Sequence, residues 1–179
     1  MRMRPFLIGV VIAVCTLPLH SSSAATTAGA ATGAGNTVEL GWGIALWDDE
    51  DQGKLIIGLM QSKPSDEDIA RIIETKSLFM SLYRLDDPML EFQIYFDASG
   101  GTANIAKPRS RTALFVNFDD KGPMTLSRSV GHADGDIKLQ GTLQPGGLVQ
   151  GRIVGSDKFE VGDDRRTYQW DVAIELPVR

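Results

Sequence analysis

The sequence predicts a mainly β protein: an antiparallel β-sandwich of about nine strands with one short helix inserted after the second strand. Apolar and polar residues alternate in many short segments, as in strands that bury one face. Turn-forming residues separate these segments, and only one segment has the apolar spacing of a helix. A closed lipocalin-like β-barrel is the alternative, because it would show the same alternation.

The first two strands are expected within residues 38–46 and 55–60. In the first, the even positions are apolar and alternate with small or polar residues. The second is apolar on both faces except for Gly58, so we expect a central strand that is covered on each side.

The helix is expected to begin at Ser65, a residue type that caps helix N-termini. Three acidic residues then occupy its first turn, where they suit the helix dipole. Its apolar stripe consists of Ile69, Ile72 and Ile73. Because so short a helix is marginal alone, we expect it to pack on one end or face of the β core.

The remaining strands are read from the same two-residue period. The clearest is the last, in which Tyr168, Trp170, Val172, Ile174 and Leu176 share one face. The other segments with this alternation cover residues 90–96, 114–118, 137–143 and 149–153.

Residues 1–25 have the layout of a secretory signal peptide. Arg2 and Arg4 precede a short apolar run, and Ala24 and Ala25 offer a small-residue cleavage site. The run is too short for the roughly 20 residues that span a bilayer. We therefore predict an exported protein, periplasmic or extracellular, with no transmembrane segment in the mature chain. A lipoprotein anchored through Cys15 is disfavoured, because Val14 replaces the small residue that precedes such a cysteine.

Cleavage would remove the only cysteine and one of the two histidines, leaving His132. Disulfides, thiolate zinc sites and cysteine nucleophiles are then excluded from the mature chain. His132 could join Ser127 or Ser129 and Asp134, but no Gly-x-Ser-x-Gly elbow is present. We therefore predict that the protein is not an enzyme.

Composition divides the rest of the chain in two. Residues 26–36 contain no large apolar side chain, and we predict a flexible Ala/Gly/Thr tether there. Residues 37–179 are expected to form a single β-domain. The chain has 18 basic and 23 acidic residues, which argues against nucleic acid as a partner.

The acidic turn that follows the first strand is the best candidate for a metal site. Asp48, Asp49 and Asp51 could bind calcium weakly, although Gln52 and Leu59 do not fit the EF-hand register counted from Asp48. The alternative is a solvated turn. No other cofactor is expected.

A candidate binding surface consists of residues that do not follow the main apolar alternation of the strands. Gly41 and Gly43 could line a groove or allow close packing. Trp47, Tyr95 and Phe115 could stack on a sugar or anchor a partner if exposed together, or fill a second buried face. We predict a protein- or glycan-binding module. The alternatives are a periplasmic inhibitor or immunity protein against a hydrolase, and an apolar-ligand carrier if the fold is a hollow barrel.

Overall fold

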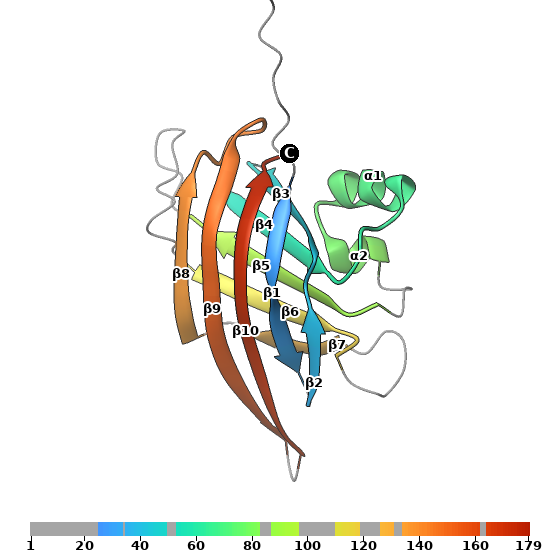
Figure 1. Ribbon diagram of the computed structural model, residues 1–179, viewed down its shortest axis with the longest axis vertical. Helices are drawn as coiled ribbons and strands as arrows, with labels where there is room; N and C mark the ends of the chain where they lie inside the picture. Colours follow the sequence, from blue (N-terminus) through green and yellow to red (C-terminus); the bar gives the residue numbers. More distant parts are fainter. Residues whose placement is uncertain are drawn as a thin grey trace, which may run out of the picture.

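The computed structural model describes residues 25–33, 35–49, 53–82, 87–96, 110–118, 126–130, 134–161 and 164–179 (Figure 1). The signal-peptide segment therefore lies outside the described residues except for Ala25. The described residues form β1 (Thr26–Gly33), β2 (Asn36–Glu39), β3 (Trp42–Asp48), β4 (Lys54–Met60), α1 (Asp66–Thr75), α2 (Leu78–Leu82), β5 (Met89–Tyr95), β6 (Ser110–Val116), β7 (Leu126–Val130), β8 (Asp134–Gly141), β9 (Leu148–Val161) and β10 (Asp164–Pro177).

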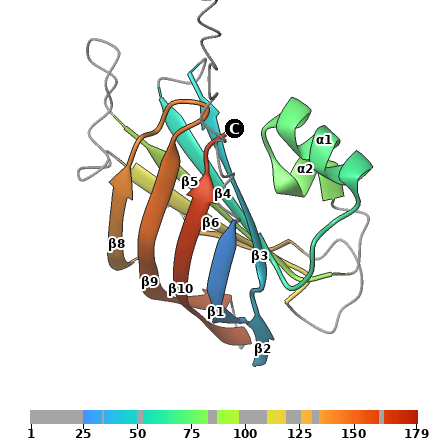
Figure 2. The ribbon, with the colours of Figure 1, turned by 45° about the horizontal axis from the view of Figure 1, so that its top comes forward.

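Two antiparallel five-stranded sheets face each other, so the predicted β-sandwich is confirmed. Sheet A has the order β2-β1-β10-β9-β8, and sheet B has the order β3-β4-β5-β6-β7. Figure 2 shows the strands of sheet A crossing in front of those of sheet B. Among the described residues, one isolated bridge pairs Ala45 of β3 with Val178, the residue after β10, and the described strands do not close into the alternative barrel.

The prediction of a flexible tether at residues 26–36 is wrong for most of that segment. Strand β1 pairs with β10 along its whole length and with β2 on its other side. Its small side chains suit this central position, because a Cβ atom at Gly29 would collide with the main-chain oxygen of Asp171. The composition argument considered only side-chain burial, whereas backbone hydrogen bonds on both sides hold this strand.

The space between the sheets holds an aromatic cluster with Phe115 at its centre. The Phe115 ring lies 4.8 Å from that of Tyr168, 5.1 Å from Phe118 and 5.6 Å from Trp170, centroid to centroid. All five apolar residues predicted to share one face of the last strand lie in this core, so that prediction is confirmed.

A second apolar layer lies on the outer face of sheet B, beneath the two helices (Figure 1). Its sheet residues come from β3, β4, β5 and β6, and its helix residues from α1 and α2. The expectation that residues 55–60 form a strand covered on both faces is therefore confirmed. Neither helix in the described part of the chain is long and apolar enough to cross a bilayer.

Helix α1 begins as the sequence predicts. The Ser65 hydroxyl accepts a hydrogen bond from the Asp68 backbone N–H at 3.1 Å. Ile69 and Ile72 are buried, whereas Ile73 is 37% exposed. The helix ends at Lys76, whose φ of 50° is left-handed.

The second helix, α2, was not predicted from the sequence. The carboxylate of Glu91, which is 1% exposed on β5, accepts hydrogen bonds from Leu78 N at 2.7 Å and Phe79 N at 3.2 Å. Ser77 Oγ and Gln93 Nε2 also donate to it, at 3.1 and 2.7 Å. A side chain from the sheet therefore satisfies N–H groups at the start of this helix that have no partner within the helix.

Gly58 allows α2 to approach the sheet this closely. It pairs with Glu91 on the neighbouring strand, and a Cβ atom at position 58 would collide with the fully buried side chain of Leu78. The leucine side chain thus occupies the space that the missing Cβ leaves.

We expect Gly58→Ala to destabilise the fold by about 2 kcal/mol, because the new methyl group must displace Leu78 from a packed position. Leu78→Ala alone should cost about 3 kcal/mol through the cavity that it leaves. The double variant should lose less stability than the two single variants together, because the methyl group added at position 58 fills space that the Leu78 side chain has vacated. Urea unfolding of the four proteins measures this coupling, and strict additivity would contradict the contact.

We expect Glu91→Ala to lower the free energy of unfolding by about 3 kcal/mol, because two buried N–H groups lose a charged acceptor. Glu91→Gln should lose less, since its amide oxygen can still accept from the helix. Urea unfolding gives both values. Equal losses for the two variants would show that the hydrogen bonds at the start of α2 do not matter.

Candidate functional site

The structure does not bring the predicted aromatic surface together. Phe115 is fully buried between the sheets. Trp47 packs beside Phe96 on that same inner side of sheet B, with ring centroids 6.4 Å apart. Tyr95 lies on the opposite face, where its hydroxyl donates to Gln93 Oε1 at 3.1 Å. A shared surface of Trp47, Tyr95 and Phe115 is therefore wrong, because Tyr95 lies on the other face of sheet B and Phe115 is buried.

Phe115 reaches the inner core by the ordinary alternation of β6, in which Leu114 and Val116 on either side of it pack beneath the helices. The irregularity comes after Phe115: the register with β7 shifts between Phe115 and Val116, and Asn117 has a φ of 58°. Phe118 consequently returns to the inner core. The sequence pattern had placed Leu114, Val116 and Phe118 on one face.

The two glycines of the candidate surface have different environments. Gly43 is buried, and a Cβ atom there would lie 2.5 Å from Thr27 Oγ1 and 3.1 Å from Leu59 Cδ2. Close packing therefore explains this glycine, which also lines the groove beside Trp42 that is described below. Gly41 is exposed in the connection between the two sheets.

Asp48 lies in an ion-paired cluster that joins α1 to sheet B. Its carboxylate is 3.2 Å from Lys54 Nζ and 3.1 Å from Lys76 Nζ, and its side chain is 11% exposed. Burial acts to raise the pKa of Asp48, but hydrogen bonds and positive charge from Lys76 and Lys54 outweigh it and hold that pKa below its usual value. Both carboxylate oxygens are thus occupied by ammonium groups.

The calcium site stays a prediction. Asp49 is exposed and lies 3.9 Å from Lys76, and Asp51 is outside the described residues. Within the described ranges, no three histidine, cysteine or acidic side chains are grouped to hold a metal. A calcium ion at Asp48 would have to displace the two lysines.

The catalytic triad considered from the sequence would need His132 as its base. His132 lies outside the described residues. Ser127 and Ser129 belong to β7, and Asp134 begins β8. The prediction of no enzymatic activity therefore stays a prediction.

A groove of about 720 Å³, the Trp47 groove, lies where α1, the end of β3 and the β8–β9 connection meet. Trp47 and Asp49 line it from the β3 side, and Ile73 and Lys76 from α1. The other side is formed by residues 141–145 and by Arg179. This groove contains two of the residues that the sequence singled out, Trp47 and Asp49.

The Trp42 groove, of about 340 Å³, adjoins the first along β3. Trp42 and Ile44 line it from the strand, and Lys63 and Asp66 line it beside α1. Ile73 and Arg179 line both grooves, so these two residues lie where the grooves meet.

Backbone hydrogen bonds hold Arg179 in this position. Its N–H donates to Ala45 O and its carbonyl accepts from Trp47 N, both at 3.0 Å. The preceding residue, Val178, exchanges two 2.8 Å bonds with Gly146 and Gly147 of the β8–β9 turn. Residues 178–179 therefore bridge the edge of β3 and that turn.

Three side chains lining the grooves retain unused binding capacity. Trp42 and Trp47 are half-buried, and within the described part of the chain their indole N–H groups have no partner. The exposed Arg179 guanidinium also pairs with no described residue. In binding sites, tryptophan provides an apolar ring surface together with an N–H group that can donate a hydrogen bond to a ligand.

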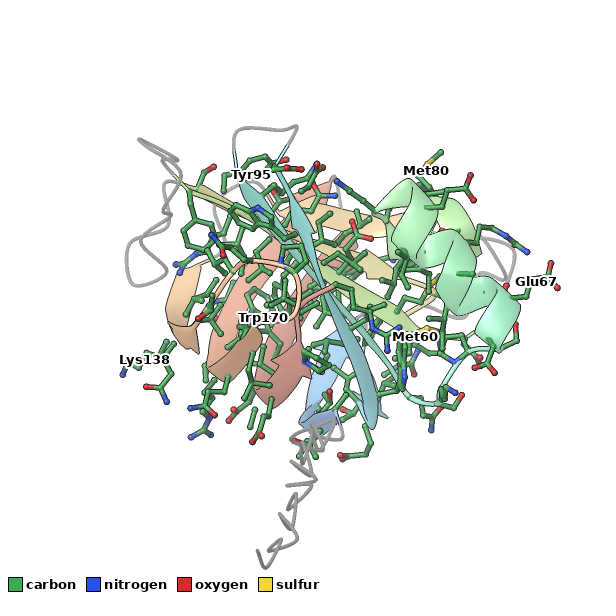
Figure 3. All side chains as sticks on the ribbon, turned by 90° about the horizontal axis from the view of Figure 1, so that it is seen from above. Met60, Glu67, Met80, Tyr95, Lys138 and Trp170 are labelled. Atoms are coloured by element: carbon green, nitrogen blue, oxygen red, sulfur yellow. The ribbon has the colours of Figure 1, made fainter. Side chains whose placement is uncertain are left out.

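The outer face of sheet A carries another open depression, of about 930 Å³. It is lined by small and polar residues, including a surface ion pair in which Arg152 donates two 2.6 Å hydrogen bonds to Asp171. Figure 3 shows Lys138 at the periphery of this sheet and Trp170 in the centre of the molecule. Because Trp170 is only 3% exposed, this face has the character of a solvated sheet surface.

Comparisons with models of known protein families, with curated proteins and with solved structures found no match to this chain.

Acid should weaken the fold partly through Asp48. Because its pKa is lower when folded, its stabilising contribution is complete above the ordinary value of 3.8 and is lost as the pH falls through the folded-state pKa. We expect Asp48→Asn to be less stable at neutral pH and to lose less stability on acidification than the wild type. Urea unfolding at a series of pH values measures both.

Asp171→Asn is the matched control, because it removes a carboxylate from an exposed ion pair that is screened by solvent. Its acid dependence should stay close to that of the wild type. Identical acid dependence in Asp48→Asn and the wild type would contradict the role given to Asp48.

Proposed function

We propose that this protein is an exported, non-enzymatic β-sandwich module that binds a ligand in the Trp47 and Trp42 grooves. The observation that carries the proposal is a pair of half-buried tryptophans, one in each of two adjoining grooves, whose indole N–H groups have no partner among the described residues. Binding sites characteristically combine apolar or aromatic walls with a few polar groups that orient the ligand.

The chemistry of the lining supports binding. The described residues that line the two grooves include no serine, cysteine or histidine. Their titratable side chains are Asp49, Asp66, Lys63, Lys76 and Arg179, and both aspartates lie beside lysines. These groups can orient a ligand through charge and hydrogen bonds, and the proposal includes no catalytic step.

The alternatives have less support. The apolar-ligand carrier depended on a hollow barrel, whereas the described strands form two separate sheets with a packed aromatic cluster between them. The inhibitor or immunity protein stays a prediction from size and acidic charge.

Intrinsic fluorescence can test the proposal, because the chain has only three tryptophans and Trp170 is buried away from both grooves. Short oligosaccharides and peptides would be titrated while emission is recorded. We expect a true ligand to change the emission, and we expect Trp47→Ala to weaken its binding about tenfold, the loss of one aromatic stacking contact.

Arg152→Ala serves as the control, since it changes the outer face of sheet A and leaves both grooves intact. A ligand that binds equally well to Trp47→Ala and Trp42→Ala but not to Arg152→Ala would place the site on sheet A and refute the proposal.

A further inference from the structure

Resting on the proposed function, we infer that the ligand is an extended oligosaccharide that carries a carboxylate. Its sugar rings stack at Trp42 and Trp47, and its carboxylate pairs with Arg179 between them. Three features of the grooves indicate this class of ligand: their length, their charge and the backbone hydrogen bonds already formed at the edge of β3.

The two tryptophans are five positions apart on an extended strand, so Trp42 packs on the helical side of sheet B and Trp47 on its inner side. At about 3.3 Å per residue, this spacing places their backbones about 16 Å apart. The grooves that they line share Ile73 and Arg179. A ligand that contacts both tryptophans must therefore be extended and must cross the edge of β3 beside Arg179.

Arg179 is the cation that remains available at the meeting point. Lys63 lies 2.9 Å from Asp66, and Lys76 lies 3.1 Å from Asp48, so both lysines are already paired. The guanidinium of Arg179 has no partner among the described residues, and its planar fork suits a carboxylate. In a chain of net charge −5, an arginine that lies between two grooves and pairs with no described residue favours an anionic ligand.

The edge of β3 disfavours a peptide that binds by strand addition. Val178 and Arg179 already lie along this edge, and the Ala45 carbonyl and the Trp47 N–H are hydrogen-bonded to Arg179. An added strand would have to break these bonds before it gained its own. A saccharide needs instead polar side chains for its hydroxyl groups, which Asp49, Thr142 and Gln144 provide in the Trp47 groove.

Calorimetric titration with matched ligands tests this inference. The probes are tetragalacturonate, a hyaluronan tetrasaccharide and the carboxyl-reduced form of each, which keeps the rings and removes the charge. We expect at least one acidic tetrasaccharide to bind about tenfold more tightly than its reduced form, as one charge-assisted pair would produce.

Variants connect this preference to named side chains. Arg179→Gln keeps the backbone hydrogen bonds of residue 179 and should abolish the difference between the acidic and reduced ligands. Trp47→Ala should weaken both forms about equally. Arg152→Gln removes one positive charge from sheet A and should change neither affinity. Urea unfolding of each variant shows whether its fold is retained.

The failures of the two proposals are distinguishable. If no acidic tetrasaccharide binds, or if Arg179→Gln retains the preference, the assignment of an acidic oligosaccharide is overturned. If peptides bind instead, and their binding requires Trp47, the assignment of an acidic oligosaccharide is wrong but the proposed binding function is supported. If binding of every ligand is independent of Trp42 and Trp47, the proposed function falls as well.

Discussion

The hydrogen bonds between the Glu91 carboxylate and the start of α2 are the constraint on which the helical side of this molecule depends. A buried charge is unfavourable unless hydrogen bonds compensate it, and four donors do so here. Beside it, Gly58 admits the Leu78 side chain. The short helix α2 is thereby held against the sheet, and α1 packs on α2 and on the same apolar layer.

The position of the candidate site follows from this arrangement. Ile73 and Lys76 form the α1 wall of the Trp47 groove, and Lys76 is joined to β3 through Asp48. The opposite wall comes from the β8–β9 connection of sheet A, with Arg179 bridging the two. The groove therefore lies at a junction of both sheets and the helical layer, where segments distant in the sequence contribute one wall each.

Sequence reasoning succeeded where a single face of an element is buried. The last strand alternates cleanly because the outer face of sheet A meets water, and Ser65 caps α1 through a local hydrogen bond. It failed for Phe115, because both faces of sheet B are buried and apolar residues at odd and even positions are then equivalent. It failed for β1 because backbone pairing with the adjacent β2 and the distant β10 leaves no signal in side-chain hydrophobicity.

The sequence alone determined the β-sandwich class, the capped helix and the inner face of the last strand, because each depends on local periodicity or on a contact within one turn. Of the candidate site, it identified Gly43, Trp47 and Asp49 as separate residues. Only the tertiary structure decided that Trp47, Ile73 and Arg179 line one groove and that Phe115 lies in the core. Those relations depend on strand pairing and on packing between sheets, which join residues far apart in the chain.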